Sequence, residues 1–182
     1  MRTQRPPWTA VAAAFVLTAL VLTAGSLSQA SAMEKTNDET VAVKLTPFGG
    51  AKSAAGGEAT FALRGDALHY KLHVEKTEDA TMAHVHMVGD DGTPSAVLAW
   101  LFPSTSPGPG LKEGTFTGTL VEGDIKAGNL SGPMKGRTVK ELYEQIEYGK
   151  AGVAVHTKKD PKVALWGSRK GQDMMEKKHD KM

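Results

Sequence analysis

Residues 68–74, Leu68-His-Tyr-Lys-Leu-His-Val74, decide the fold class of this chain. Apolar side chains occupy every second position, and histidine or lysine fills the positions between them. This period of two is typical of a β-strand with one buried and one polar face. The segment from Ala59 to Leu63 alternates in the same way, and the turn residues Arg64-Gly-Asp66 connect the two. The pattern therefore predicts an antiparallel hairpin.

Further strands are predicted on both sides of this hairpin. One precedes it, from Val41 to Leu45, and the others follow it at 82–88, 96–102, 114–121, 153–157 and 163–166. Glycine-rich turns or prolines separate most of these segments, which keeps them short. Seven or so short strands and one helical insertion indicate an all-β fold, either a Greek-key β-sandwich or a barrel.

The helical insertion begins at Thr138. Thr138-Val-Lys-Glu141 is a capping box, in which the threonine hydroxyl and the glutamate carboxylate each satisfy an unpaired backbone N–H. Apolar residues follow at helical spacing, and Gly149 is a suitable end. We predict that Leu142 and Ile146 pack against the sheet and close one end of the domain.

The first 32 residues have the organisation of an export signal. Arg2 and Arg5 precede an apolar stretch from Trp8 to Leu27, and Ala30-Ser-Ala32 provides the small residues that signal peptidases recognise. An uncleaved membrane anchor is the alternative, because the stretch approaches the ~20 residues that span a bilayer. Polar residues dilute the stretch and no basic cluster follows it. We expect cleavage after Ala32, a periplasmic or secreted domain, and no stable membrane insertion afterwards.

The rest of the chain is divided by composition. Residues 33–40 are predicted to be a disordered lead-in, 41–167 the β domain, and 168–182 a flexible polar tail that contains methionines and His179. The chain has 22 Lys and Arg against 20 Asp and Glu, and Arg2 and Arg5 account for the whole excess. A neutral domain argues against nucleic acid as a partner. The absence of cysteine excludes disulfides, thiolate nucleophiles and cysteine-ligated metals.

Three of the six histidines form a candidate metal site. His84 and His86 are two apart in a predicted strand, so their side chains emerge from one face with Cα atoms roughly 6.5 Å apart. His156 ends another predicted strand. Three imidazoles from two strands suit copper, or less readily zinc, with one coordination position left open. Met82 has the same parity and can add a soft ligand, and Asp90-Asp91 offers carboxylates to orient the imidazoles.

The alternative is that these histidines lie on a solvated sheet face, or form a hydrogen-bonded cluster that only holds loops in place. His69 and His73 are four apart, too far to share an ion, and are predicted to lie on the surface. The Met/His-containing tail is a less favoured copper ligand. The sequence contains none of the common nucleophile, phosphate-loop or H-E-x-x-H motifs, which favours a protein without enzymatic activity.

The order of these features resembles the CHRD domain, a module of chordin and of exported microbial proteins. The motifs that carry the resemblance are Val41-Ala-Val-Lys-Leu45, Gly57-Glu-Ala-Thr-Phe61, Leu68-His-Tyr-Lys-Leu72, Ala83-His-Val-His86, Gly114-Thr-Phe-Thr-Gly118 and Val153-Ala-Val-His-Thr157. The final strand departs from the family pattern, with Pro161-Lys-Val-Ala-Leu-Trp-Gly167 in place of G-E-I-R-G. The resemblance implies an all-β extracytoplasmic domain.

A weaker resemblance is to copper/zinc superoxide dismutases, which carry H-V-H on one strand and another copper-binding histidine late in the chain. His84, His86 and His156 match three copper ligands in order, but a bridging histidine, a zinc cluster and a cysteine pair are missing. Three hypotheses follow: a non-enzymatic copper-binding protein, an extracellular interaction or structural module without metal, and a dismutase-like enzyme. The first is our leading hypothesis.

Overall fold

A computed structural model describes residues 40–108 and 110–170 of the chain. These residues form seven strands, one α-helix, α1 (Val139–Glu147), and three short 3-10 helices, η1 (Phe48–Gly50), η2 (Ala127–Asn129) and η3 (Gly132–Met134). The strands are β1 (Thr40–Pro47), β2 (Gly56–Arg64), β3 (Ala67–Val88), β4 (Pro94–Phe102), β5 (Lys112–Lys126), β6 (Ala151–Thr157) and β7 (Leu165–Ser168). The prediction of an all-β fold with one helical insertion is confirmed.

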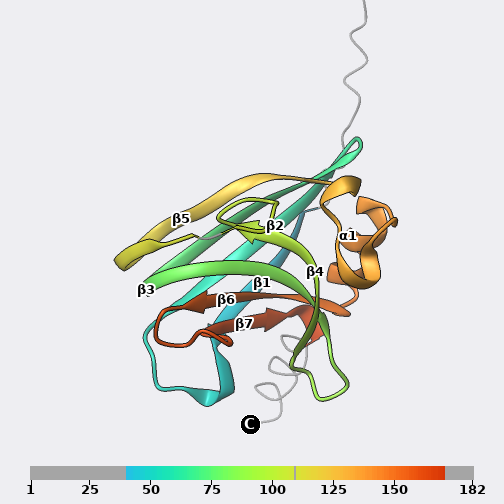
Figure 1. The fold of residues 1–182 in the computed structure, drawn as a ribbon. Coiled ribbons are helices and arrows are strands. Elements are labelled where there is room, and N and C mark those ends of the chain that lie inside the picture. The colour runs from blue at the N-terminus through green and yellow to red at the C-terminus, as the bar shows by residue number, and fades with distance from the viewer. Residues whose placement is uncertain (1–39, 109, 171–182) are drawn as a thin grey trace, which may run out of the picture. The chain divides into compact units, whose positions relative to one another are not determined.

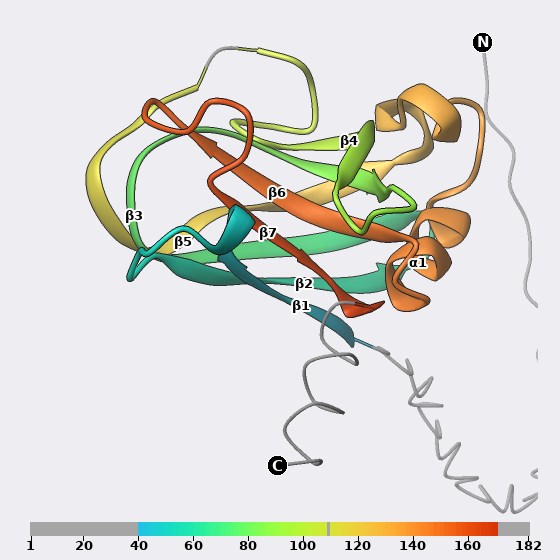
Figure 2. The same cartoon turned by 90° about the horizontal axis from the view of Figure 1, so that it is seen from below.

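Five of these strands close into a barrel (Figures 1 and 2). β2 pairs with β1, β1 with β7, β7 with β6, β6 with β3, and β3 with β2, and every pairing is antiparallel. β4 and β5 pair with the other edge of β3, so that Leu68 lies between Leu63 and Ile125, and Val85 between Ala99 and Val153. The predicted hairpin is present as β2 and β3.

β3 is one continuous strand of 22 residues, where the sequence predicted two separate strands, 68–74 and 82–88. The alternation fails between them because the register with β5 shifts twice, after Val74 and after Glu78. Lys76 and Asp79 have φ values of 45° and 47°, a backbone conformation that residues other than glycine rarely adopt. The Asp79 carboxylate accepts a hydrogen bond from the Gly114 N–H at 2.7 Å and holds this bulge. Bulges bend a strand, and the bent β3 pairs with β2 before the bulges and with β6 after them.

α1 covers one end of the barrel, where it packs against β2, β3 and β6 (Figure 2). The capping box is formed as predicted: the Glu141 N–H donates to the Thr138 hydroxyl at 3.2 Å, and the Thr138 N–H donates to the Glu141 carboxylate at 2.8 Å. Leu142 and Ile146 are fully buried in the core. Gly149, with φ of 68°, follows the helix in the left-handed conformation.

Several predicted boundaries and one predicted orientation differ from the structure. β5 is longer than the predicted 114–121, and β7 begins at Leu165, where the sequence predicted a strand from Val163. Met87, which strict alternation with His84 and His86 would point into the core, is 39% exposed. The β3–β4 register is irregular on both sides of His86, so simple alternation is lost there. The predicted leader and most of the predicted lead-in and tail lie outside the described residues, but Thr40 belongs to β1 and Ser168 to β7. Among the described residues, no helix has the length and apolar character to cross a membrane.

Candidate metal centre

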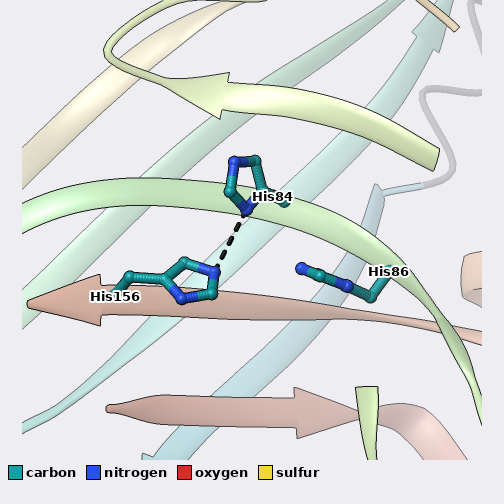
Figure 3. A group of neighbouring side chains, drawn as sticks. All are labelled: His84, His86 and His156. Carbon is teal, nitrogen blue, oxygen red and sulfur yellow. Dashed lines mark hydrogen bonds between the residues drawn. The ribbon is translucent and has the colours of Figure 1, made fainter. Parts of the chain in front are cut away.

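The three predicted histidines come together between β3 and β6 (Figure 3). β3 carries His84 and His86, β6 carries His156, and the antiparallel register sets Met82 opposite His156 and His84 opposite Ala154. One nitrogen from each ring lies within 4.8 Å of the other two. The side chains are 5%, 8% and 6% exposed, respectively. The alternative of a solvated sheet face is therefore wrong, because all three imidazoles are buried.

Two tryptophans cover this cluster, and sequence reasoning missed both. Trp166 on β7, Ala154 on β6, His84 on β3 and Trp100 on β4 are aligned across four neighbouring strands. Side chains in register share one face of a sheet, so the two indoles flank the histidines. The ring centroids of Trp100 and His84 are 4.2 Å apart, and those of Trp166 and His86 are 6.4 Å apart. A single strand pattern cannot show this row, because it depends on the register between strands.

Glycine at position 152 makes room for the Trp166 ring. A Cβ atom built on Gly152 would lie 2.7 Å from Cη2 of Trp166 and clash with the Gly167 carbonyl oxygen. Gly152 is also the β6 residue paired with His86. The tip of the indole therefore lies over β6 at the level of His86, and any larger residue at position 152 would displace it.

Backbone carbonyls orient two of the imidazoles. Nδ1 of His86 lies 2.8 Å from the Ser95 carbonyl oxygen, and Nδ1 of His156 lies 3.1 Å from that of Pro161. A carbonyl oxygen only accepts, so each Nδ1 carries the hydrogen and each neutral ring presents the lone pair on Nε2. The sequence predicted carboxylates of Asp90 and Asp91 in this orienting role. That prediction is wrong for these bonds, and the Asp91 carboxylate accepts instead from the Thr93 N–H and hydroxyl at 3.0 and 2.7 Å.

The third imidazole binds to another imidazole. Nδ1 of His84 lies 3.1 Å from Nε2 of His156. Since Nε2 of His156 holds a lone pair, Nδ1 of His84 is the donor, which leaves a lone pair on its own Nε2. Nε2 of His84 and Nε2 of His86 are buried and have no hydrogen-bond partner among the described residues. Each unsatisfied buried group costs about 1–3 kcal/mol of stability.

These residues fit a metal ion that prefers nitrogen ligands. The rings point toward one another (Figure 3), and the unpaired nitrogen of His86 faces the other two rings. His84 reaches the shared space through Nδ1, so if it binds an ion there, its hydrogen moves to Nε2. No carboxylate belongs to the cluster among the described residues. The donor set therefore suits copper or zinc better than calcium or magnesium, which prefer oxygen.

Burial keeps all three imidazoles in the neutral form that binds metals. Burial, with smaller contributions from the neighbouring His156 and His86, lowers the pKa of His84 to about 3. Burial also lowers the pKa of His86, against the opposing effect of the Ser95 carbonyl, and lowers the pKa of His156, against that of Pro161. From its reference pKa of about 6.5 alone, an imidazole would be protonated by mild acid. In this site the lone pairs persist into more acidic solution.

Acid is expected to destabilise the metal-free domain. Between the lowered pKa of the folded state and about 6.5 in the unfolded state, the unfolded chain binds protons that the folded chain does not. The free energy of unfolding therefore decreases as the pH is lowered, by up to about 1.4 kcal/mol per pH unit for each such histidine, until the pH reaches the folded-state pKa. Urea unfolding at pH 7 and pH 5, with a chelator present, measures this slope. Changing His84, His86 and His156 to glutamine should flatten it, and equal slopes would contradict the burial of these rings.

The remaining candidates lie away from this cluster or stay untested. His69 on β3 lies between two carboxylates of β5, 3.0 Å from Asp124 and 3.3 Å from Glu122, and is partly buried. His73 is also partly buried and outside the cluster. Met82, opposite His156 in the register, stays a candidate for a soft ligand. The tail with His179 lies outside the described residues.

Comparisons with known proteins give one match. The model of the CHRD domain family matches residues 23–168, a range that includes all seven strands and the three histidines. No curated protein and no solved structure matches the sequence. The weaker resemblance to copper/zinc superoxide dismutases therefore gains no support from them.

Proposed function

Because this chain belongs to the CHRD domain family, as its strand motifs predicted, we propose that it is an exported protein that binds one metal ion, copper in preference to zinc. His84, His86 and His156 are the proposed ligands. The protein holds the ion and carries out no reaction of its own.

The support for a metal is the unsatisfied Nε2 of His86, which faces the rings of His84 and His156 (Figure 3). A cluster that only held loops in place would gain stability from satisfying each polar atom. This cluster instead keeps the buried lone pair on Nε2 of His86 without a partner among the described residues, while backbone carbonyls orient the rings of His86 and His156. Such a cost is expected where a ligand supplies the missing interaction.

The preference for copper follows from the donor set. Three neutral imidazoles bind divalent first-row metals in an order that peaks at Cu²⁺ and falls at Zn²⁺. Met82, close in the strand register, adds the soft donor that reduced copper favours. Zinc accepts the same nitrogens and is the alternative cargo.

A titration tests this function. The chain that begins at Met33 is titrated with Cu²⁺ and with Zn²⁺, beside a variant with His84, His86 and His156 changed to alanine. We expect one site, tighter for copper, that is lost in the triple variant and kept in a His69→Ala, His73→Ala control. If the triple variant binds copper as tightly as the parent, the site lies elsewhere, and the Met/His tail is the first candidate. A chain ending at Lys170 tests that candidate because it lacks the tail. Absence of binding in the parent would favour the extracellular interaction or structural module without metal. Superoxide turnover by the metal-loaded chain would favour the dismutase-like enzyme.

Export is supported by the order of charged, apolar and small residues in the first 32 positions. In the native host we expect mature protein with Met33 at its N-terminus, in the periplasm or the medium. Intact-mass analysis of that material measures the cleavage point. Recovery of membrane-bound chains that still contain Trp8 to Leu27 would show the uncleaved anchor instead.

A further inference from the structure

A cavity of about 470 Å³ lies on the outer side of Trp166. Its lining includes Asp90, Asp91 and Gly92 from the turn after β3, and Lys170 from the end of the described chain. The same indole contacts His86, with ring centroids 6.4 Å apart and planes at 81°. Trp166 therefore forms a wall that the cavity shares with the three-histidine cluster. Trp100, on the other flank of the cluster, does not line this cavity.

One hydrogen bond holds the outer edge of this wall. Nε1–H of Trp166 donates to the Gly92 carbonyl at 3.0 Å. Gly92 lies in a turn, with φ of 81°, that closes through backbone bonds between Gly89 and Gly92 and between Gly89 and Thr93. The inner edge of the indole lies over Gly152, which has no side chain to bind it. Among the described residues, rotation of the ring therefore breaks one neutral hydrogen bond, which is a modest barrier for a partly exposed side chain.

We propose that Trp166 is a gate, and that the cavity beside it is the port through which a metal ion enters and leaves the three-histidine site. This inference rests on the proposed function, because it assumes that the site holds a metal. Among the described residues that line the port, the carboxylates of Asp90 and Asp91 outnumber the ammonium group of Lys170. An approaching cation therefore meets a weakly attractive field before it reaches the indole.

A gate changes rates, whereas a wall that only packs changes affinity. Removing a gate speeds entry and exit together, so the dissociation constant, their ratio, changes little. A residue that only stabilises the loaded site would instead slow exit, and its loss would weaken binding. The two roles are therefore separated by measuring both rate constants.

Stopped-flow fluorescence with Cu²⁺ as the probe measures these rates. The chain that begins at Met33 contains only Trp100 and Trp166 as tryptophans. Each variant of Trp166 therefore keeps Trp100 beside the site, and the fluorescence of that indole reports quenching by bound copper. Uptake is followed after mixing with Cu²⁺, and release after mixing the loaded protein with excess EDTA.

We expect Trp166→Ala to raise both rate constants by about tenfold or more while the dissociation constant changes by less than about threefold. Trp166→Phe, which keeps a ring but lacks the N–H, should give a smaller rise in both. A chain with His69→Ala and His73→Ala, both outside the cluster and the port, is the control and should leave both rates within about twofold of the parent.

Parental rates in Trp166→Ala would overturn the gate, and so would weaker binding with an unchanged uptake rate. If thermal unfolding shows that Trp166→Ala does not fold, Trp166→Phe decides: faster exchange supports the gate and parental exchange overturns it. A parent chain that binds no copper would instead overturn the proposed function, a result that the titration detects independently of these variants.

Discussion

Saturating copper is expected to raise the free energy of unfolding of this domain by about 4 kcal/mol when the free ion is a thousand times its dissociation constant. The proposed site exists only in the folded state, because β3 and β6 bring His84, His86 and His156 within reach of one another. The gain therefore follows from mass action. Urea unfolding of the chain from Met33, with and without Cu²⁺, measures it.

The control for this prediction is the triple alanine variant of the three histidines. It should show no gain from copper, and EDTA should return the loaded parent to its metal-free stability. Substituting His69 and His73, which lie outside the cluster, should leave the gain unchanged. A gain of equal size in the triple variant would mean that copper stabilises the domain through other residues.

Replacing Leu142 with alanine is expected to lower the free energy of unfolding by about 2 to 5 kcal/mol, the usual range for a large aliphatic side chain removed from a core. Leu142 has no exposed surface, and α1 packs against three strands of the barrel. The loss combines the transfer free energy of the removed methyl groups with the cavity left at this end of the barrel. Thermal or urea unfolding of the metal-free chain measures it.

Lys140→Ala is the matched control on the same helix. Lys140 is exposed and forms an ion pair with Glu144 at 3.2 Å, one turn along α1. Such surface pairs contribute about 0.3–0.5 kcal/mol, so this variant should stay close to the parent. A loss below ~0.5 kcal/mol for Leu142→Ala would mean that this side chain contributes little to the core.

Local patterns determined the class of the fold and part of the site. Alternation in 68–74 and the neighbouring segments predicted the strands, and the capping box at Thr138 predicted where α1 begins. The spacing of His84 and His86 predicted that they share a face. These features depend on residues within one strand or one helical turn, where backbone geometry sets the period directly.

Bulges were beyond such patterns. The continuous β3, the left-handed residues Lys76 and Asp79, and the exposed Met87 all occur where the register of β3 with a neighbouring strand shifts. One extra residue in a strand reverses the direction of every side chain after it relative to the partner. Alternation read along a single segment cannot show where that happens.

The tertiary structure alone decided what surrounds the histidines. The register of β3 with β6 sets His156 beside His84, and the registers of β4 and β7 add Trp100 and Trp166 on either side. The carbonyls of Ser95 and Pro161, which any residue type would supply, orient His86 and His156. Pairing between distant strands is selected by the packing of the whole barrel, and backbone groups leave no mark in the sequence of side chains. For these reasons the sequence could name the three candidate ligands, and only the fold could show that they are buried, neutral and covered by two indoles.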